Sequence, residues 1–131
     1  MVTLIGMGSG SWEALSAQAQ DAVRRAGLVF GAKRLLAGLP PECTARQFAL
    51  YQPAEILETL AQAPGQDAAV LYSGDTGFYS GASGLLTPLR ALGIPARVYP
   101  GVSSIQLLAA ALGRPWQDWK LVSAHGCACD P

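Results

Sequence analysis

The chain has 131 residues, half of them hydrophobic, and its nine basic and nine acidic side chains give zero formal net charge. This length and composition predict one compact domain with a real core and exclude a disordered chain. The balance of charge, without clustered Lys and Arg, excludes a nucleic-acid footprint. The apolar runs stop well before the roughly 20 residues of a membrane span, so we expect no membrane partner. The first residues lack the charged and apolar regions of a signal peptide, so we expect no secretion signal, and three sparse cysteines are typical of a cytoplasmic protein.

Short apolar runs alternate with longer helical patterns in the first half of the chain. Residues 2–5 are expected to form a strand that ends at glycines, and residues 12–26 a helix with one apolar stripe. A second strand is expected at 28–30 and a short helix at 32–36, before the two prolines at 40 and 41. Residues 43–50 are ambiguous and fit a loop with a short strand.

The second half continues this alternation. Residues 53–63 are expected to be helical, with Pro53 in the first turn, and residues 68–72 to form a fully buried strand. Residues 80–92 are expected to be helical with a kink at Pro88. The remaining expected elements are a strand at 96–99, a helix at 103–112 and a strand at 121–123.

This order of elements predicts an α/β fold, in which an open, mostly parallel, five-stranded sheet carries helices on both faces. Ligands of such sheets bind at the carboxyl ends of the strands. The loops at 6–10, 73–77, 100–104 and 124–126 follow expected strands and are rich in glycine, serine or both. We therefore expect these loops to converge on one edge of the sheet.

The first of these loops contains Gly6, Gly8 and Gly10. It differs from a dinucleotide fingerprint, because Ser11 stands where the third glycine belongs and the second strand runs into Gly31 without an acidic residue. A nucleotide-dependent oxidoreductase is therefore a disfavoured alternative. A plain tight turn between strand and helix stays equally open for this loop alone.

The second and third loops carry the polar side chains. Asp75 can accept hydrogen bonds from a ligand, or can form an Asx-turn with its own backbone. Ser103 can cap the following helix, whose first amide groups would also favour a carboxylate.

Taken in this order and at these spacings, the loops resemble the tetrapyrrole methylase family along essentially the whole chain. Residues 4–10 resemble its first motif, with Ser9 where proline is usual, and residues 73–76 resemble its glycine–aspartate–proline loop, with Thr76 in place of proline. Residues 100–104 are similar to the third motif. The segments at 29–36, 104–106, 114–118 and 123–126 resemble the precorrin carbon-5 branch.

The resemblance implies a two-domain enzyme that binds S-adenosylmethionine between its domains. It would methylate ring carbon 5 of a corrin precursor in cobalamin biosynthesis, and also carbon 15 in a fused enzyme. The implied donor-binding residues are Ser73, Gly74, Asp75, Thr76, Tyr79, Ser103 and Ser104. Gly8, Ser9 and Arg34 are expected on the substrate side. No catalytic base is assigned, because direct displacement at a sulfonium needs no covalent enzyme intermediate.

The family continues with a second domain where this chain has residues 127–131. We therefore expect residues 1–123 to be the N-terminal α/β domain, residues 124–131 to begin an interdomain linker, and the chain alone to be inactive. The alternative is a non-catalytic assembly module, since an uncovered apolar face favours self-association; a homo-oligomer is expected in either case. His125, Cys127 and Cys129 are a poor zinc set, so no metal is expected. Trp116 and Trp119 are expected to clamp a loop onto the core.

Overall fold

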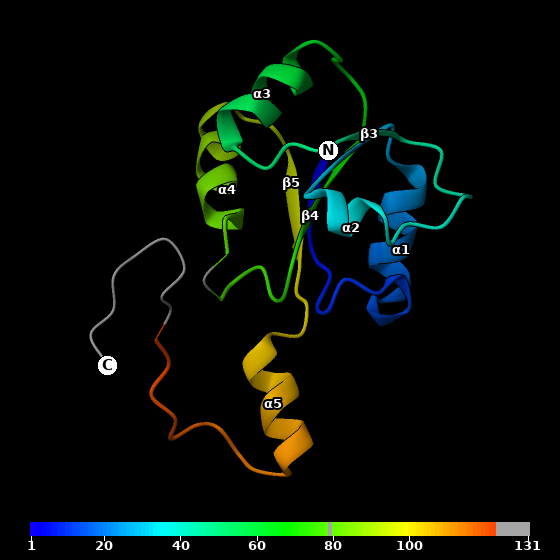
Figure 1. Ribbon diagram of the computed structural model, residues 1–131. Helices are drawn as coiled ribbons and strands as arrows, with labels where there is room; N and C mark the ends of the chain where they lie inside the picture. The colour runs from blue at the N-terminus through cyan, green and yellow to red at the C-terminus, as the bar shows by residue number, and fades with distance from the viewer. Residues whose placement is uncertain (79, 123–131) are drawn as a thin grey trace.

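A single sheet of five parallel strands forms the centre of the computed structural model, which describes residues 1–78 and 80–122 (Figure 1). Its strand order is β3-β2-β4-β1-β5, and every pairing is parallel. The strands are β1 Val2–Gly6, β2 Leu28–Phe30, β3 Arg46–Phe48, β4 Ala68–Tyr72 and β5 Ala96–Tyr99. The prediction of an α/β fold with a parallel five-stranded sheet is confirmed.

The helices follow the strands in alternation. They are η1 Trp12–Ala14, α1 Ala17–Arg25, α2 Lys33–Leu36, α3 Pro53–Ala61, α4 Ala82–Ala91 and α5 Ser104–Leu112. The single helix expected at 12–26 is divided, because Ser16 caps α1 by accepting a 3.2 Å hydrogen bond from the Ala19 amide. Pro88 lies inside α4.

Helices cover both faces of the sheet, and each face has its own core (Figure 1). Ile5 and Val29 pack with α1 and α2 on one face. Leu4 and Phe30, their neighbours in the same strands, pack with α3 and α4 on the other face. Successive side chains of a strand point to opposite faces, so the continuous apolar runs of β1, β2 and β4 are buried on both sides.

The fifth strand is β3, and the strand expected at 121–123 is wrong for Leu121 and Val122, which lie outside any strand. Ser123 is outside the described residues. A turn in which the Trp119 amide donates to the Trp116 carbonyl at 3.0 Å precedes this segment. After that turn the chain runs back beside α5 and not along β5 (Figure 1).

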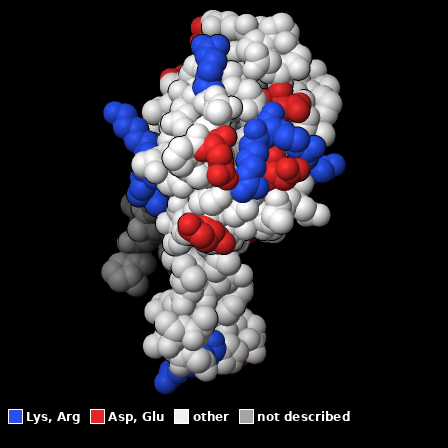
Figure 2. Space-filling view, turned by 90° about the vertical axis from the view of Figure 1, so that its right-hand side faces the viewer, with Lys and Arg blue, Asp and Glu red and all other residues white. Residues whose placement is uncertain are grey.

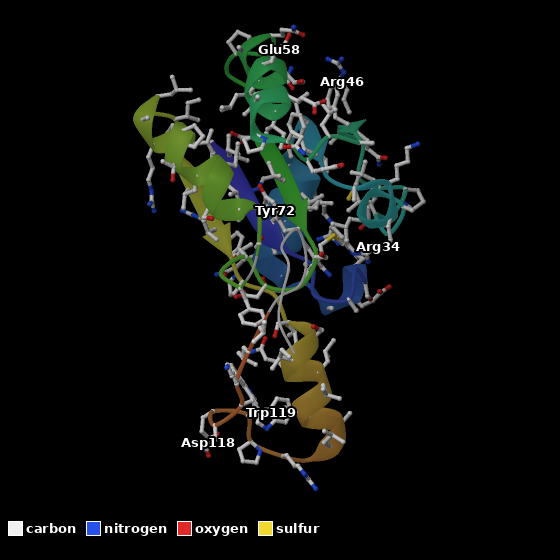
Figure 3. All side chains as sticks on the ribbon, turned by 60° about the vertical axis from the view of Figure 1, so that its left-hand side comes forward. Arg34, Arg46, Glu58, Tyr72, Asp118 and Trp119 are labelled. Carbon is white, nitrogen blue, oxygen red and sulfur yellow. The ribbon has the colours of Figure 1, made fainter. Side chains whose placement is uncertain are left out.

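We call residues 1–103 the body and residues 104–122 the arm, because α5 and the segment after it project from the rest of the molecule (Figure 1). Ala109 is the one buried side chain of α5. Trp116 is exposed and Trp119, labelled in Figure 3, is half-buried on the arm. The expectation that the two tryptophans clamp a loop onto the core is therefore wrong. In Figure 2 the charged side chains gather over the body, while the projecting part is mostly uncharged. None of the described helices has the length and apolar character needed to cross a membrane.

Candidate functional site

Two of the glycine loops are joined directly by their backbones. The Gly8 amide donates to the Gly74 carbonyl at 3.1 Å, and the Gly74 amide donates to the Gly8 carbonyl at 2.9 Å. The pair extends the neighbouring strands β1 and β4 by one antiparallel bridge beyond their carboxyl ends. Residues that are 66 positions apart in the sequence therefore form one continuous piece of backbone.

The third loop packs against these two without any intervening side chain. A Cβ atom on Gly101 would lie 2.2 Å from the Gly74 carbonyl oxygen and 2.6 Å from the Gly6 carbonyl oxygen. A Cβ atom on Gly6 would lie 2.7 Å from the Gly101 nitrogen. Only glycine allows so close an approach of two backbones. The close partner of Gly6 and Gly101 is thus other backbone of the same protein.

Asp75 links the second loop to the third. Its Oδ1 atom accepts a 3.0 Å hydrogen bond from the Gly101 amide, and its Oδ2 atom accepts a 3.1 Å hydrogen bond from the Gly77 amide. The second contact is the Asx-turn that the sequence left open, and the first is a bond between loops that the sequence did not predict. Hydrogen bonds to a carboxylate are stronger than neutral ones, so this link holds the two loops firmly.

Thr76 adds a second link to the same neighbour. Its side chain is only 9% exposed, and its hydroxyl donates to the Tyr99 carbonyl at the end of β5 at 3.3 Å. Thr76 does not line the pocket described below. The structure therefore places this predicted donor-binding residue behind the wall of the site.

The start of α5 forms the opposite side of the site. Ser103 and Gln106 make a capping box, in which the Gln106 amide donates to Ser103 Oγ at 3.3 Å and the Ser103 amide donates to Gln106 Oε1 at 2.7 Å. This is the capping role that the sequence predicted for Ser103. Ser104, the first residue of α5, is exposed.

The three loops and α5 line a pocket of about 510 Å³. Seven of the ten residues named from the sequence line it, namely Gly8, Ser9, Ser73, Gly74, Asp75, Ser103 and Ser104. The first three loops therefore gather at one edge of the sheet, as predicted, and the fourth, at 124–126, lies outside the described residues. Asp75 is the one charged residue in this lining, as far as the described residues show.

One further predicted residue of the described part of the chain lies apart from the lining. Arg34 approaches the first loop from α2, where its Nη1 atom is 3.5 Å from the Ser9 carbonyl oxygen (Figure 3). Tyr79 is outside the described residues, as are His125, Cys127 and Cys129.

An apolar wall of the pocket was missed by the sequence analysis. It consists of Phe78, Val102, Ile105, Leu107, Leu121 and Val122. Most of these residues belong to the arm, for which the sequence predicted only a helix and a strand. A signal was available, because apolar residues occupy α5 on nearly every side, which is more than one core-facing stripe needs.

Tyr72 ends β4 beside this edge (Figure 3), and its hydroxyl is buried without a hydrogen-bond partner. Burial raises the pKa of Tyr72 to about 12, because the apolar surroundings disfavour the phenolate. Its ring packs against the core that contains α3 and α4, and Tyr72 is absent from the pocket lining. No pattern in the sequence predicts this unpartnered hydroxyl.

Comparison with known proteins agrees with this geometry. The family model of the Tetrapyrrole (Corrin/Porphyrin) Methylases matches residues 1–131. The cobalt-precorrin-7 C(5)-methyltransferase of Salmonella typhimurium is 34% identical over 128 residues, which cover 96% of this chain and 62% of that protein. The decarboxylating precorrin-6Y C(5,15)-methyltransferase of a Sinorhizobium species is 32% identical, over 98% of this chain and 31% of its own length. This chain thus spans less than two thirds of the length of each of these relatives.

Solved structures show the same fold. The precorrin-6Y methylase of Archaeoglobus fulgidus has a TM-score of 0.77 at 21% identity, over 95% of this chain and 65% of its own. The uroporphyrin-III C-methyl transferase of Thermus thermophilus, complexed with S-adenosylhomocysteine, has a TM-score of 0.68 at 25% identity, over 92% of this chain and 51% of its own. With a family model matched from end to end and this arrangement of loops, the chain belongs to the tetrapyrrole methylases.

Proposed function

We propose that this chain is the donor-binding, N-terminal part of an S-adenosylmethionine-dependent methyltransferase that acts on ring carbon 5 of a corrin precursor in cobalamin biosynthesis. In a fused enzyme of the same kind, carbon 15 would be a second target. The observation that carries the proposal is the single pocket lined by residues from three separate strand ends and α5. The names of the similar proteins from Salmonella and Sinorhizobium supply the class of reaction.

The pocket suits a small zwitterion with a sulfonium group. The carboxylate of Asp75 is the negative charge of the described lining, and the first amide groups of α5 favour the carboxylate of a ligand. The wall formed with Ile105 and Leu107 is apolar. The positive charge of the sulfonium disappears as the methyl group leaves, so apolar surroundings favour the transition state over the ground state.

The main role of the described residues would then be to orient the methyl donor and the acceptor. Ser73, Gly74 and Ser104 would hold the donor, while Gly8 and Ser9 face the acceptor. In the reaction the bond from sulfur to the methyl carbon breaks as the bond to the ring carbon forms, and the electron pair returns to sulfur. Correct alignment of two reactants can contribute roughly 7–11 kcal/mol to such a displacement. Arg34, beside Ser9, is placed to bind a carboxylate of the substrate.

Two further proposals concern the whole protein. Residues 1–123 would be its first domain and residues 124–131 the start of a linker to a second domain that completes the pocket. We place the protein in the cytoplasm, where thiols stay reduced. Cys43 is consistent with this location, because it is a buried free thiol whose pKa is raised by burial.

A second candidate function is that of a non-catalytic assembly module. It is favoured by one observation, the exposure of Leu107, Leu108 and Leu112 on α5, which are 48%, 50% and 55% exposed. Apolar patches of this kind mark interaction surfaces. The occupant we propose is a second copy of this chain, which pairs through α5 and forms a homo-oligomer.

Calorimetric titration with S-adenosylhomocysteine tests the main proposal. We expect saturable binding by the chain, and none of NAD. The variant Ser104→Phe fills the pocket and should weaken binding at least about tenfold. The matched control is Ser83→Phe, at an exposed serine of α4 outside the lining. Equal affinity in both variants, or an absence of binding by the parent chain, would contradict the proposed function and leave the assembly module.

A further inference from the structure

The arm is fixed to the body by very little packing. Neither core of the body contains a residue of α5 among the described residues, and Ala109 is the one buried side chain of this helix. The direction of α5 is therefore set where the chain leaves the body, at residues 99–103. What holds these residues decides where one wall of the pocket stands.

Two adjacent side chains of the second loop hold this exit point. Thr76 donates to the carbonyl of Tyr99, the last residue of β5, and Asp75 accepts from the amide of Gly101. The two bonds grip the chain on either side of Pro100. The second oxygen of Asp75 is bound to the Gly77 amide, so the carboxylate is itself held in place by its own loop.

Backbone contact also limits how closely residues 99–103 can approach the second loop. Gly101 already touches the carbonyl oxygens of Gly6 and Gly74, because a Cβ atom there would approach them to 2.6 and 2.2 Å. The exit point is therefore pulled by hydrogen bonds toward the second loop and limited by backbone contact on the same side. Ser103, two residues further on, then begins α5 with its capping box.

We propose that Asp75 and Thr76 are positioning residues, which fix the start of α5 against the ends of β1 and β4 and so set the separation of the two pocket walls. One wall carries Val102, Ser104 and Ile105, and the other carries Gly8, Ser73 and Gly74. Thr76 acts entirely from behind the site. Asp75 acts through the Gly101 amide, in addition to any charge that it presents to the ligand. This inference rests on the proposed function only where ligand binding is measured.

Amide hydrogen exchange in the free chain tests the grip without any ligand. Thr76→Val removes the hydroxyl at nearly constant shape, and Asp75→Ala removes both acceptors. In each variant we expect the Gly101 amide to exchange at least about tenfold faster, while the amides of β4 keep their parental rates. The matched control is Thr59→Val, which removes a hydroxyl bonded to the Glu55 carbonyl in α3 and should leave Gly101 unaffected.

Titration of the same variants with S-adenosylhomocysteine separates positioning from direct contact. We expect Thr76→Val to bind roughly fivefold more weakly, Asp75→Ala more weakly still, Thr59→Val like the parent, and Thr76→Ser to recover most of the loss because it keeps the hydroxyl. Far-UV circular dichroism establishes that each variant is folded.

The outcomes divide cleanly. Unchanged exchange at Gly101 in Asp75→Ala overturns the proposal, and so does faster exchange with undiminished affinity in Thr76→Val. A loss of affinity confined to Asp75→Ala would mean that this residue acts by direct contact with the ligand. If the parent chain does not bind S-adenosylhomocysteine, the proposed function fails, and the exchange rates alone decide whether Asp75 and Thr76 hold the start of α5.

Discussion

The body and the arm each contain a helix of similar length, α4 and α5, yet the two helices differ in what covers them. Leu85 in α4 is fully buried against the sheet, whereas Leu108 in α5 is 50% exposed. Helix α4 contributes Ala82, Leu85 and Leu89 to a core, and α5 contributes nothing to either core of the described residues. An apolar helix in the sequence therefore does not by itself predict a helix that packs on its own domain.

The two helices also differ in what stabilises them locally. The N-cap of helix α4 is Gly81, which has no side chain to accept a hydrogen bond, and the helix contains Pro88, so packing on the sheet must support it. Helix α5 has a capping box at Ser103 and ends at Gly113, whose φ of +65° is the left-handed conformation that glycine adopts readily. Helix α5 is thus stabilised at its two ends, and its exposed sides can contact a partner.

The largest expected effect is in the body. Leu85→Ala leaves a cavity under α4 and should lower the free energy of unfolding by about 3–4 kcal/mol, measured by urea denaturation. Leu92→Ala is the matched control, because this leucine closes the same helix and is 64% exposed. A loss of less than about 1 kcal/mol in Leu85→Ala would mean that α4 is packed no better than α5.

The next effect lies at the junction between the two regions. Gly101→Ala places a methyl group 2.2 Å from a carbonyl oxygen, so the third loop must move away from the first two. We expect a loss of about 2–3 kcal/mol in stability, with weaker binding of S-adenosylhomocysteine. Gly84→Ala in α4 is the control, because its Cβ would make an ordinary 3.8 Å contact with Pro53 of α3 and should stabilise by about 0.5–1 kcal/mol. A neutral Gly101→Ala would contradict the close packing of the loops.

The fold of the body could be predicted from the sequence, because burial there follows the periodicity and the length of the apolar runs. The runs in β1 and β4 are apolar on both faces and are followed by helices, a pattern that leaves a parallel sheet as the simplest fold. Parallel strands end at the same edge, and this alone brings Gly8, Ser73 and Ser103 to one pocket. The position of the site was therefore predictable from connectivity.

The arm and the detailed roles were not predictable, for two physical reasons. Whether Leu108 is covered depends on a surface outside its own helix, which periodicity does not describe. The role of Asp75 depends on a 26-residue separation that the sheet closes to a 3.0 Å contact with Gly101, and no local pattern encodes that contact. The same holds for the lack of a partner at the Tyr72 hydroxyl.

A smaller effect tests this buried hydroxyl. The pKa of Tyr72 is raised from 10 to about 12 in the folded protein, so at high pH the unfolded chain loses this proton first. The contribution of Tyr72 to the free energy of unfolding is therefore fully present below pH 10 and is lost as the pH rises through about 12. Because the side chain is only partly buried, we expect the loss to be about 1–2 kcal/mol. Chemical denaturation at pH values between about 9 and about 12 measures this loss of stability.

Tyr72→Phe provides the comparison for that measurement. It removes the unpartnered hydroxyl and should raise stability near neutral pH by about 1 kcal/mol. It should also abolish the part of the alkaline loss that belongs to this residue, whereas Tyr51→Phe, at an exposed tyrosine, should not. If the stability of Tyr72→Phe and of the parent falls identically at alkaline pH, burial does not raise the pKa of Tyr72 in solution.

The smallest effect on stability is expected in the arm, where it is most informative about function. Leu108→Lys alters a half-exposed side chain that contacts neither core, so unfolding should change by no more than about 0.5 kcal/mol. If α5 pairs with a second copy of the chain, however, two charges enter an apolar interface, and the dimer dissociation constant should rise at least about tenfold by sedimentation equilibrium. Leu92→Lys places the same charge on an exposed leucine of the body and should leave association unchanged. Equal association in both variants would remove α5 as the contact between copies, and its exposed leucines would then be left for the second domain that we propose completes the pocket.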